Sequence, residues 1–355
     1  MIKRFFAGGN TVKGFYSYFD NILPIENAKR IFVIKGGPGT GKSTTMKTIA
    51  LEMEKEGHIV ELCHCSSDNN SLDGVFIKDI AVLIVDGTAP HVVDLKLPGI
   101  VDEIVNLGDF WNEEKLKENK DVISVCKDKI SDLFYNAYSY LGAVNEINKS
   151  IDNINSKYFG DKFAKDIADN IFKSLKFEQK NKQGKERKLF LSAITSDGII
   201  NYAETISHMS NRNIVLLSNT NINTGRIIEI IAKQLMEKGI DIETFYSPFA
   251  PDKQIEHLYV EDLELFITSK NRFLEYNGKS DLIINIDTDF ISEEDKRLLE
   301  FNFETTETLI KKAVENINKA REKHNEIETY YIENMDFNKL NDITLSIINK
   351  IKNMH

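Results

Sequence analysis

The chain has 355 residues, of which 41% are hydrophobic and 28% are charged, and its formal net charge is -10. The length suggests about two domains, and the negative charge excludes a nucleic-acid surface over the whole molecule, because such a surface would repel a polyanion. Three cysteines are too few for a disulfide framework, and the sequence contains neither a membrane span nor the apolar stretch of a secretory signal. We therefore expect a cytoplasmic protein.

The first elements predicted along the chain are a strand, a glycine-rich loop and a helix. Residues 31–34 form a dense apolar run typical of a buried parallel strand. From 43 to 55 the apolar residues recur at helical spacing, and Gly57 suits the end of that helix. Between them, residues 36–43 match G-x-x-x-x-G-K-[ST] at every fixed position. Strand, loop and helix follow one another in the order that a phosphate-binding P-loop needs.

The residue types of this loop predict how it would bind a nucleotide. The expected phosphate cradle consists of Gly36, Gly37, Pro38, Gly39, Thr40, Gly41, Lys42, Ser43 and Thr44. The glycines allow several backbone N–H groups to point at phosphate oxygens, and the helix N-terminus adds its positive dipole end. Lys42 is expected to contact the β- and γ-phosphates and to act in catalysis, while Ser43 offers a hydroxyl to Mg²⁺. Because no Asn-Lys-x-Asp guanine-reading motif is present, ATP with Mg²⁺ is favoured over GTP.

A second apolar run, residues 80–85, predicts a strand that ends at Asp86. In P-loop proteins an aspartate in this Walker B position holds the Mg²⁺ shell, so Ser43 and Asp86 are the expected metal residues. The alternative is an aspartate that merely ends a strand. Many ATPases place a glutamate directly after this aspartate to activate water, whereas Gly87 follows here. The sequence therefore predicts slow hydrolysis, with the general base supplied from elsewhere.

The candidates for this base lie after the strand expected at 59–62. Asp68 and Asp73 follow it in a polar stretch, and ligands of α/β sheets bind beyond the carboxyl ends of parallel strands. We expect this loop to face the γ-phosphate, with a merely solvated loop as an equal alternative. His91 is a further candidate for contact with phosphate or acceptor, against the alternative of a surface histidine. Residues 63–65, Cys-His-Cys, lack the further ligands of a zinc site and are expected to be structural.

The chain also aligns with itself. Aligned positions include Arg30 with Arg212 (an offset of 182), Gly57 with Gly239, Glu61 with Glu243, and Asn145-Glu146-Ile147 with Asn325-Glu326-Ile327. Their order along two similar halves indicates a tandem duplication. We predict a three-layer α/β/α P-loop NTPase domain at 1–178, a basic linker at 179–187 and a degenerate repeat at 188–355. Each half ends in a helical section, and 307–331 is expected to form one long helix.

The second copy of the loop is altered. Residues 218–225 read S-N-T-N-I-N-T-G, with one glycine and no lysine at the key position, and Thr268 aligns with Asp86. We expect this half to bind nucleotide weakly or not at all and to serve a structural or regulatory role or to bind another ligand. We expect the second half to pack on the first as a pseudo-dimer, in which Arg212 or Arg226 could act on the first site in trans.

Four segments together resemble a known group of proteins. They are F-A-G-G-N-T-V-K-G-F (6–15), G-G-P-G-T-G-K-S-T-T (36–45), S-S-D-N-N-S-L-D-G (66–74) and V-D-G-T-A-P-H (85–91). The chain resembles bacterial tandem-repeat P-loop proteins of spore-forming Firmicutes, which are labelled as ATPases or nucleotide-binding proteins. The resemblance implies an NTPase fold and ATP binding, and it implies no particular substrate.

Three functions follow from these observations. The first is an ATP-binding protein, a Mg²⁺-dependent ATPase whose hydrolysis is slow or regulated by a partner. The second is a kinase of a small molecule or nucleotide, and the third is a nucleotide-gated interaction protein without significant turnover. The expected partners are a nucleoside triphosphate and a protein or small molecule that the sequence does not identify, whereas nucleic acid is not expected.

Overall fold

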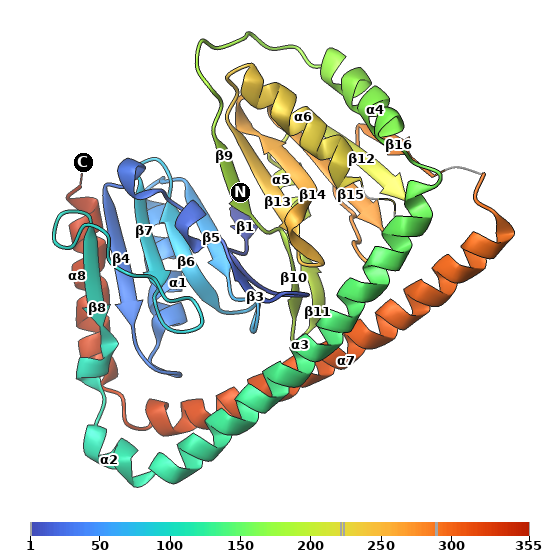
Figure 1. Cartoon of the computed structure of the whole chain (residues 1–355). Helices are drawn as coiled ribbons and strands as arrows, with labels where there is room; N and C mark the ends of the chain where they lie inside the picture. Colours follow the sequence, from blue (N-terminus) through green and yellow to red (C-terminus); the bar gives the residue numbers. More distant parts are fainter. Residues whose placement is uncertain (1, 221, 223, 288–289, 355) are drawn as a thin grey trace.

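The computed structural model describes residues 2–220, 222, 224–287 and 290–354. They form a mixed α/β protein with two six-stranded sheets, accompanied by helices that include two very long ones (Figure 1). In this part of the chain, no helix combines the length and the apolar character needed to cross a membrane.

The elements follow the internal repeat. The first half contains β1 (Lys3–Phe5), β2 (Gly8–Thr11), β3 (Gly14–Ser17), β4 (Arg30–Lys35), α1 (Lys42–Lys55), β5 (Val60–His64), β6 (Leu72–Ile77), β7 (Val82–Asp86) and β8 (Asp102–Asn106). The second half contains β9 (Glu186–Leu189), β10 (Ser192–Thr195), β11 (Gly198–Asn201), α5 (Ala203–Ser207), β12 (Arg212–Ser218), α6 (Gly225–Glu237), β13 (Ile242–Ser247), β14 (Ala250–Val260), β15 (Leu265–Asn271) and β16 (Leu282–Asn285). The remaining helices are α2 (Glu113–Glu118), α3 (Lys120–Ser156), α4 (Asp161–Lys173), α7 (Glu293–Ile332) and α8 (Phe337–Lys352).

The two sheets have equivalent strand orders. The first runs β1-β5-β6-β7-β4-β8, and the second, read from the matching edge, runs β9-β13-β14-β15-β12-β16. In each sheet the third strand, β6 or β14, is antiparallel to both neighbours, so the sheets are mixed. The sequence analysis missed β6, because its Asp and Gly residues look like a continuation of the preceding turn. The predicted strands at 31–34 and 80–85 correspond to β4 and β7, and the helix predicted at 307–331 is the C-terminal part of α7.

Each sheet has one face covered by helices and another that joins a shared core. Helices α1 and α8 pack on the alternating apolar residues Phe32, Ile34 and Ile84 of the first sheet, and α6 and α4 cover the corresponding face of the second. The opposite faces contribute to a single buried cluster, for example Val33 from β4 and Val215 from β12. Burial of this apolar surface holds the two halves together.

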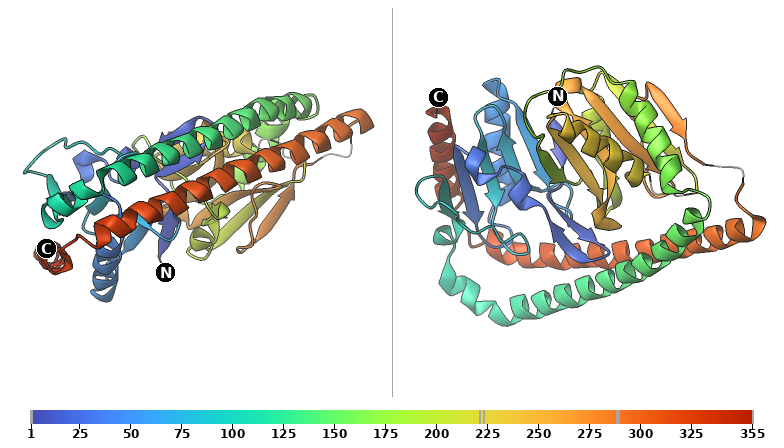
Figure 2. Two further views of the ribbon diagram at one scale, coloured as in Figure 1. Left: turned by 90° about the horizontal axis from the view of Figure 1, so that it is seen from below. Right: turned by 45° about the horizontal axis from the view of Figure 1, so that its top comes forward.

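The long helices exchange places between the halves. Helix α3 starts beside the first sheet and ends beside the second, where α4 packs on α6 (Figure 1). Helix α7 runs back alongside α3, and α8 then packs on α1 (Figure 2). Thr45 of α1 and Thr344 of α8, for instance, have hydroxyl oxygens 3.3 Å apart. The helical section of each half therefore covers the sheet of the other half, so the sequence boundary at 179–187 does not separate two packing units.

The two halves also meet at a polar contact. The backbones of Phe6 and Phe190 exchange two N–H···O hydrogen bonds of 2.9 Å. Beside them, the Lys3 ammonium lies 2.7 Å from both the Glu61 and the Glu243 carboxylates, and Arg187 lies 2.7 Å from Glu61 and 3.1 Å from Glu243. We call these four residues the interhalf ion network. It contains one cation and one anion from each half, so its charges balance.

Candidate nucleotide site

The glycine-rich loop connects the carboxyl end of β4 to the start of α1. Four consecutive buried residues of β4 anchor it in the sheet, and α1 begins at Lys42. The residue before the helix, Gly41, has φ +83°, and Gly39 has φ +66°. Residues other than glycine rarely adopt this left-handed conformation, so the sequence spacing of the glycines matches the turns of the backbone. The predicted cradle continues into the first turn of α1, where the Thr44 side chain is exposed.

Lys42 is folded over the loop. Its ammonium group donates to the carbonyl oxygens of Gly36 (2.9 Å) and Gly37 (2.8 Å) and lies 3.7 Å from the Asp86 carboxylate. Asp86 ends β7, directly beside β4, because Ile34 and Asp86 are partners in the parallel ladder. Burial raises the pKa of Asp86, and the Lys42 charge opposes this effect. The loop thus holds a cation between its own carbonyl oxygens and the carboxylate that ends the neighbouring strand.

Two oxygen donors at the same edge fit a Mg²⁺ ion. The Ser43 hydroxyl oxygen accepts a hydrogen bond from the Leu72 N–H (3.0 Å), and the hydroxyl keeps a free lone pair. One Asp86 carboxylate oxygen accepts from the backbone N–H of Thr88 (2.8 Å), which fixes the carboxylate. Hydroxyl and carboxylate oxygens are the ligand types that Mg²⁺ prefers, so the donor set suits the ion expected from the sequence.

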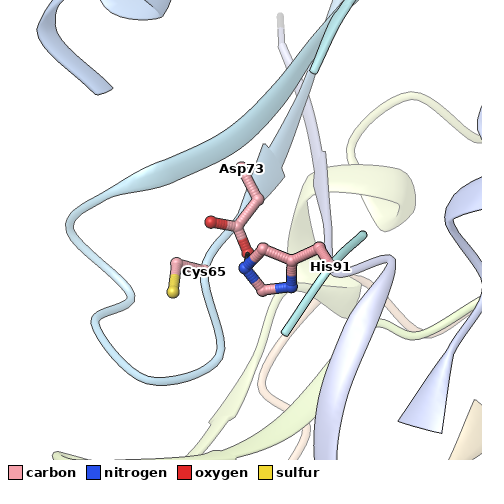
Figure 3. A group of neighbouring side chains, drawn as sticks. All are labelled: Cys65, Asp73 and His91. Carbon is pink, nitrogen blue, oxygen red and sulfur yellow. Dashed lines mark ion pairs between the residues drawn. The ribbon is translucent and has the colours of Figure 1, made fainter. Parts of the chain in front are cut away.

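Asp73 lies next to this edge, in a cluster with His91 and Cys65 (Figure 3). It is the second residue of β6 and follows Leu72, the partner of Ser43. The His91 Nε2 atom is 3.3 Å from the Asp73 carboxylate, and the ligand atoms of all three residues lie within 4.8 Å of one another. Burial disfavours the charged imidazole, but the Asp73 carboxylate outweighs it and raises the pKa of His91. Such a group can move a proton or orient an acceptor hydroxyl, and its donor atoms can also bind a metal.

These positions correct two details of the sequence analysis and place Cys65. His91 is not a surface histidine, because only 8% of it is exposed and its ring stacks on Phe19 with centroids 4.9 Å apart. Asp73 lies in a strand rather than in a loop. Cys65 lies one residue past the end of β5, after a register irregularity at Cys63 and His64, and its sulfur joins Asp73 and His91 there.

Asp68 remains in the turn between β5 and β6. Its carboxylate accepts hydrogen bonds from the Ser71 hydroxyl (2.7 Å) and the Asn70 N–H (3.3 Å), so it mainly stabilises the turn. It is also 4.0 Å from the guanidinium of Arg321 on α7. Of the two aspartates predicted as candidates for the base, Asp73 is buried beside Ser43, whereas Asp68 lies at the rim.

The loop is covered by residues that the sequence analysis did not assign to the site, namely Glu328 and Tyr331 of α7 and Leu340 of α8. We call these residues the roof of the loop. A Cβ atom at Gly37 would lie 2.9 Å from the ring of Tyr331, and one at Gly39 would lie 2.8 Å from the Glu328 carbonyl oxygen. Both residues belong to the last turns of α7. At Gly41 the neighbour is Leu340 of α8, at 2.5 Å. The glycines are therefore required by packing against these helices as well as by backbone conformation.

The altered loop of the second half already holds an anion of its own. The Asp287 carboxylate accepts hydrogen bonds from the backbone N–H groups of Asn219 (2.7 Å) and Thr220 (3.2 Å) and from the Ser218 hydroxyl (3.0 Å). Its counterpart in the first half is Gly108, because both residues donate a backbone N–H to an asparagine two residues earlier. Two of the altered loop's residues, 221 and 223, lie outside the described part of the chain.

The key side chains of the first site are also replaced. Thr224, at the offset of Lys42, has its hydroxyl oxygen 2.5 Å from that of Ser269. Ser269 is the structural counterpart of Asp86, because it pairs with Leu216 as Asp86 pairs with Ile34. The alignment of Thr268 with Asp86 was therefore wrong by one residue. A neutral hydroxyl pair stands where the first half has a lysine and an aspartate.

The two arginines considered for action in trans point elsewhere. Arg212 donates to the carbonyl and hydroxyl oxygens of Ser174, at 3.0 and 2.8 Å. Arg226 pairs with Asp161 and Glu229.

Comparisons with protein-family models, curated proteins and solved structures found no match for this chain. The function proposed below therefore rests on residue chemistry and geometry.

Proposed function

We propose that the first half binds ATP with Mg²⁺ in the loop of residues 36–44 and hydrolyses it slowly. The observation that carries this proposal is the position of Lys42, which bridges two loop carbonyls and faces Asp86 across 3.7 Å. The glycine-rich loop, the helix N-terminus and a buried carboxylate on the adjacent strand form the arrangement that phosphoryl-transfer sites use. We also propose that each half is a variant of the three-layer P-loop fold and that the chain belongs with the tandem P-loop proteins it resembles.

In this proposal each group has a defined part. The loop N–H groups and Lys42 bind the phosphates and stabilise the charge that develops on the transferred phosphoryl group. Ser43 and Asp86 would hold Mg²⁺, which supplies neutralisation of phosphate charge when bound. Asp73 accepts the proton of the attacking water, and His91 holds the Asp73 carboxylate in position. The roof restricts the access of water to the loop.

The test is to measure Mg·ATP binding by calorimetry and ADP release in the wild type and in Lys42→Ala. Loss of the lysine should weaken ATP binding by about 100-fold, because the phosphates lose a charge-assisted contact in a partly buried site. Lys47→Ala on the exposed face of α1 serves as a matched control and should bind ATP like the wild type. Equal ATP affinity in Lys42→Ala and the wild type would refute the proposal.

The role of Asp73 has its own test. Asp73→Asn keeps the shape of the side chain but removes the proton acceptor, so kcat should fall about 10²-fold or more with little change in ATP affinity. The Asp68→Asn variant should retain most of the turnover, because Asp68 stabilises the turn. If both variants turned over ATP like the wild type, the base would have to be another group.

A kinase is the second candidate, and the Asp73–His91 pair favours it. A buried aspartate beside the phosphate loop can receive the proton of an acceptor hydroxyl as well as that of water. ADP formation that rises with an added pool of small hydroxyl compounds, and is lost in Asp73→Asn, would support phosphoryl transfer. ADP formation that does not depend on any acceptor would support hydrolysis.

A further inference from the structure

The roof over the first loop is provided by the second half of the chain. Helix α7 begins after β16 of the second sheet and reaches the first sheet only in its last turns (Figure 1). Tyr331 and Glu328 cover Gly37 and Gly39. His324 lies one turn before Glu328, and its Nδ1 atom is 3.5 Å from the Glu328 carboxylate. Arg321 precedes His324 by three residues, so both side chains lie on the same face of the helix.

Arg321 connects three segments at the rim of the site. Its guanidinium donates to the Ser196 hydroxyl (2.8 Å) and to the Asp197 carboxylate (3.0 Å), both in the turn between β10 and β11. The same guanidinium nitrogen is 4.0 Å from Asp68, in the turn that leads into β6. These contacts are at the surface, with about a third of the Arg321 side chain exposed. Exposed ion pairs are weak, so the guanidinium can change partners at little cost.

The equivalent helix in the first half differs at the same positions. The alignment of Asn145 with Asn325 places Leu141 at Arg321, Val144 at His324 and Ile151 at Tyr331. All three residues of α3 are fully buried and apolar. Helix α3 reaches the altered loop, where the Asn155 side-chain amide donates to the Thr220 carbonyl oxygen (3.1 Å). Polar residues therefore stand on the helix that covers the intact loop, and apolar ones on the helix that covers the altered loop.

The charge around the first loop leaves a place for a second cation. Lys42 is shared with Asp86, and the Lys35 ammonium, at the end of β4, is held by the carbonyl oxygens of Gly87 and Val93. Asp73 adds negative charge beside Asp86. The terminal phosphate of a nucleotide carries about two negative charges, and in ATP this charge lies one phosphate further from the nucleoside than in ADP. Phosphate oxygens prefer the bidentate donors of arginine. Arg321 is a cation of α7 that borders both the Asp68 turn and the His324 face.

We propose that Arg321 is supplied in trans by the second half to contact the γ-phosphate of ATP bound in the first half. In this role it leaves Asp197 for the phosphate, so that the site distinguishes ATP from ADP and couples the nucleotide state to the β10–β11 turn. The proposal rests on the function proposed above for the loop of residues 36–44.

The experiment compares the affinities of Mg·ATP and Mg·ADP and the rate of ADP release in the wild type, Arg321→Ala and Arg321→Lys. We expect Arg321→Ala to bind ATP about 10-fold more weakly, the equivalent of one lost charge-assisted hydrogen bond. Its ADP affinity should stay within about 2-fold of the wild type, and its kcat should fall by about 10²-fold or more. Arg321→Lys should recover part of the affinity but little of the rate, since lysine lacks the bidentate geometry.

Two further variants distinguish a direct contact between Arg321 and the phosphate from a purely structural role of Arg321. Lys323→Ala, whose lysine pairs with Glu326 on the same helix, should behave like the wild type. Asp197→Asn frees Arg321 from its present partner, so ATP affinity should be kept or increased. Equal losses of ATP and ADP affinity in Arg321→Ala, or an unchanged ratio of the two, would overturn the proposal while Lys42→Ala still tests the loop. If the wild type bound neither nucleotide, both proposals would fall.

Discussion

The two halves have the same strand order and similar helix placement, yet the loop after β4 contains a lysine in the first half, whereas the loop after β12 in the second half contacts an aspartate. In the first half Lys42 and Asp86 face each other, and Gly108 leaves the loop without a side chain at that place. In the second half the Asp287 carboxylate binds the loop N–H groups. The loop and helix N-terminus of a strand–loop–helix unit present backbone N–H groups that favour an anion. The rest of the half determines whether that anion is a ligand or a side chain of the protein.

The largest effect is expected from breaking the interhalf ion network. Arg187→Ala leaves the buried carboxylates of Glu61 and Glu243 with Lys3 alone, which should reduce the free energy of unfolding by about 3–5 kcal/mol. Chemical denaturation measures this difference. Lys182→Ala removes an exposed pair with Asp241 and should cost at most about 1 kcal/mol. Similar losses in the two variants would mean that the network does not hold the halves together.

Acid should act on the same network. Burial alone would raise the pKa of Glu61, but the charges of Arg187 and Lys3 outweigh it and hold the pKa at about 2. A depressed carboxyl pKa adds stability that is complete above the unfolded value and is lost as the pH falls toward 2, by on the order of 3 kcal/mol. Between about pH 5 and pH 2, the range of this titration, the free energy of unfolding should therefore fall more steeply with decreasing pH in the wild type than in Glu61→Gln. Denaturation at a series of pH values measures this slope.

A smaller effect is expected at the internal anion of the second half. Asp287→Ala leaves the N–H groups of Asn219 and Thr220 without their carboxylate and should cost about 1.5–3 kcal/mol. Added inorganic phosphate should restore part of this loss in the variant and have less effect on the wild type. If phosphate stabilised both proteins equally, the loop would not be the place where the anion acts.

The smallest effect is expected when a carboxylate is introduced into the first half at the position equivalent to Asp287. Gly108→Asp places a carboxylate at the position of Asp287, so ATP binding should weaken by about 10-fold through repulsion of the phosphates. A Cβ there would lie 2.9 Å from the Asn106 side chain, so the backbone must adjust slightly. Gly108→Asn makes the same adjustment without a charge and is the matched control. Equal affinities in the two variants would show that charge at this position is unimportant.

Local patterns in the sequence were sufficient for some elements and not for others. The P-loop spacing located β4 and α1, and the internal alignment anticipated two similar sheets. Strand β6 was missed because its residues L-D-G-V-F-I follow a polar turn and are recognisable only from their complete burial. The approach of Cys65, Asp73 and His91 depends on three separate segments. The exchange of α3 and α7 between the halves, which brings Tyr331 to the first loop, is a property of tertiary packing that helical periodicity does not encode.

The most direct test of the central claim is the stoichiometry of Mg·ATP binding, measured by calorimetry on the wild type, Lys42→Ala and Arg226→Ala. The account predicts one nucleotide per chain in the wild type and in Arg226→Ala, and none in Lys42→Ala at the same concentrations. Two nucleotides per chain, or binding that survives Lys42→Ala and is lost in Arg226→Ala, would contradict it.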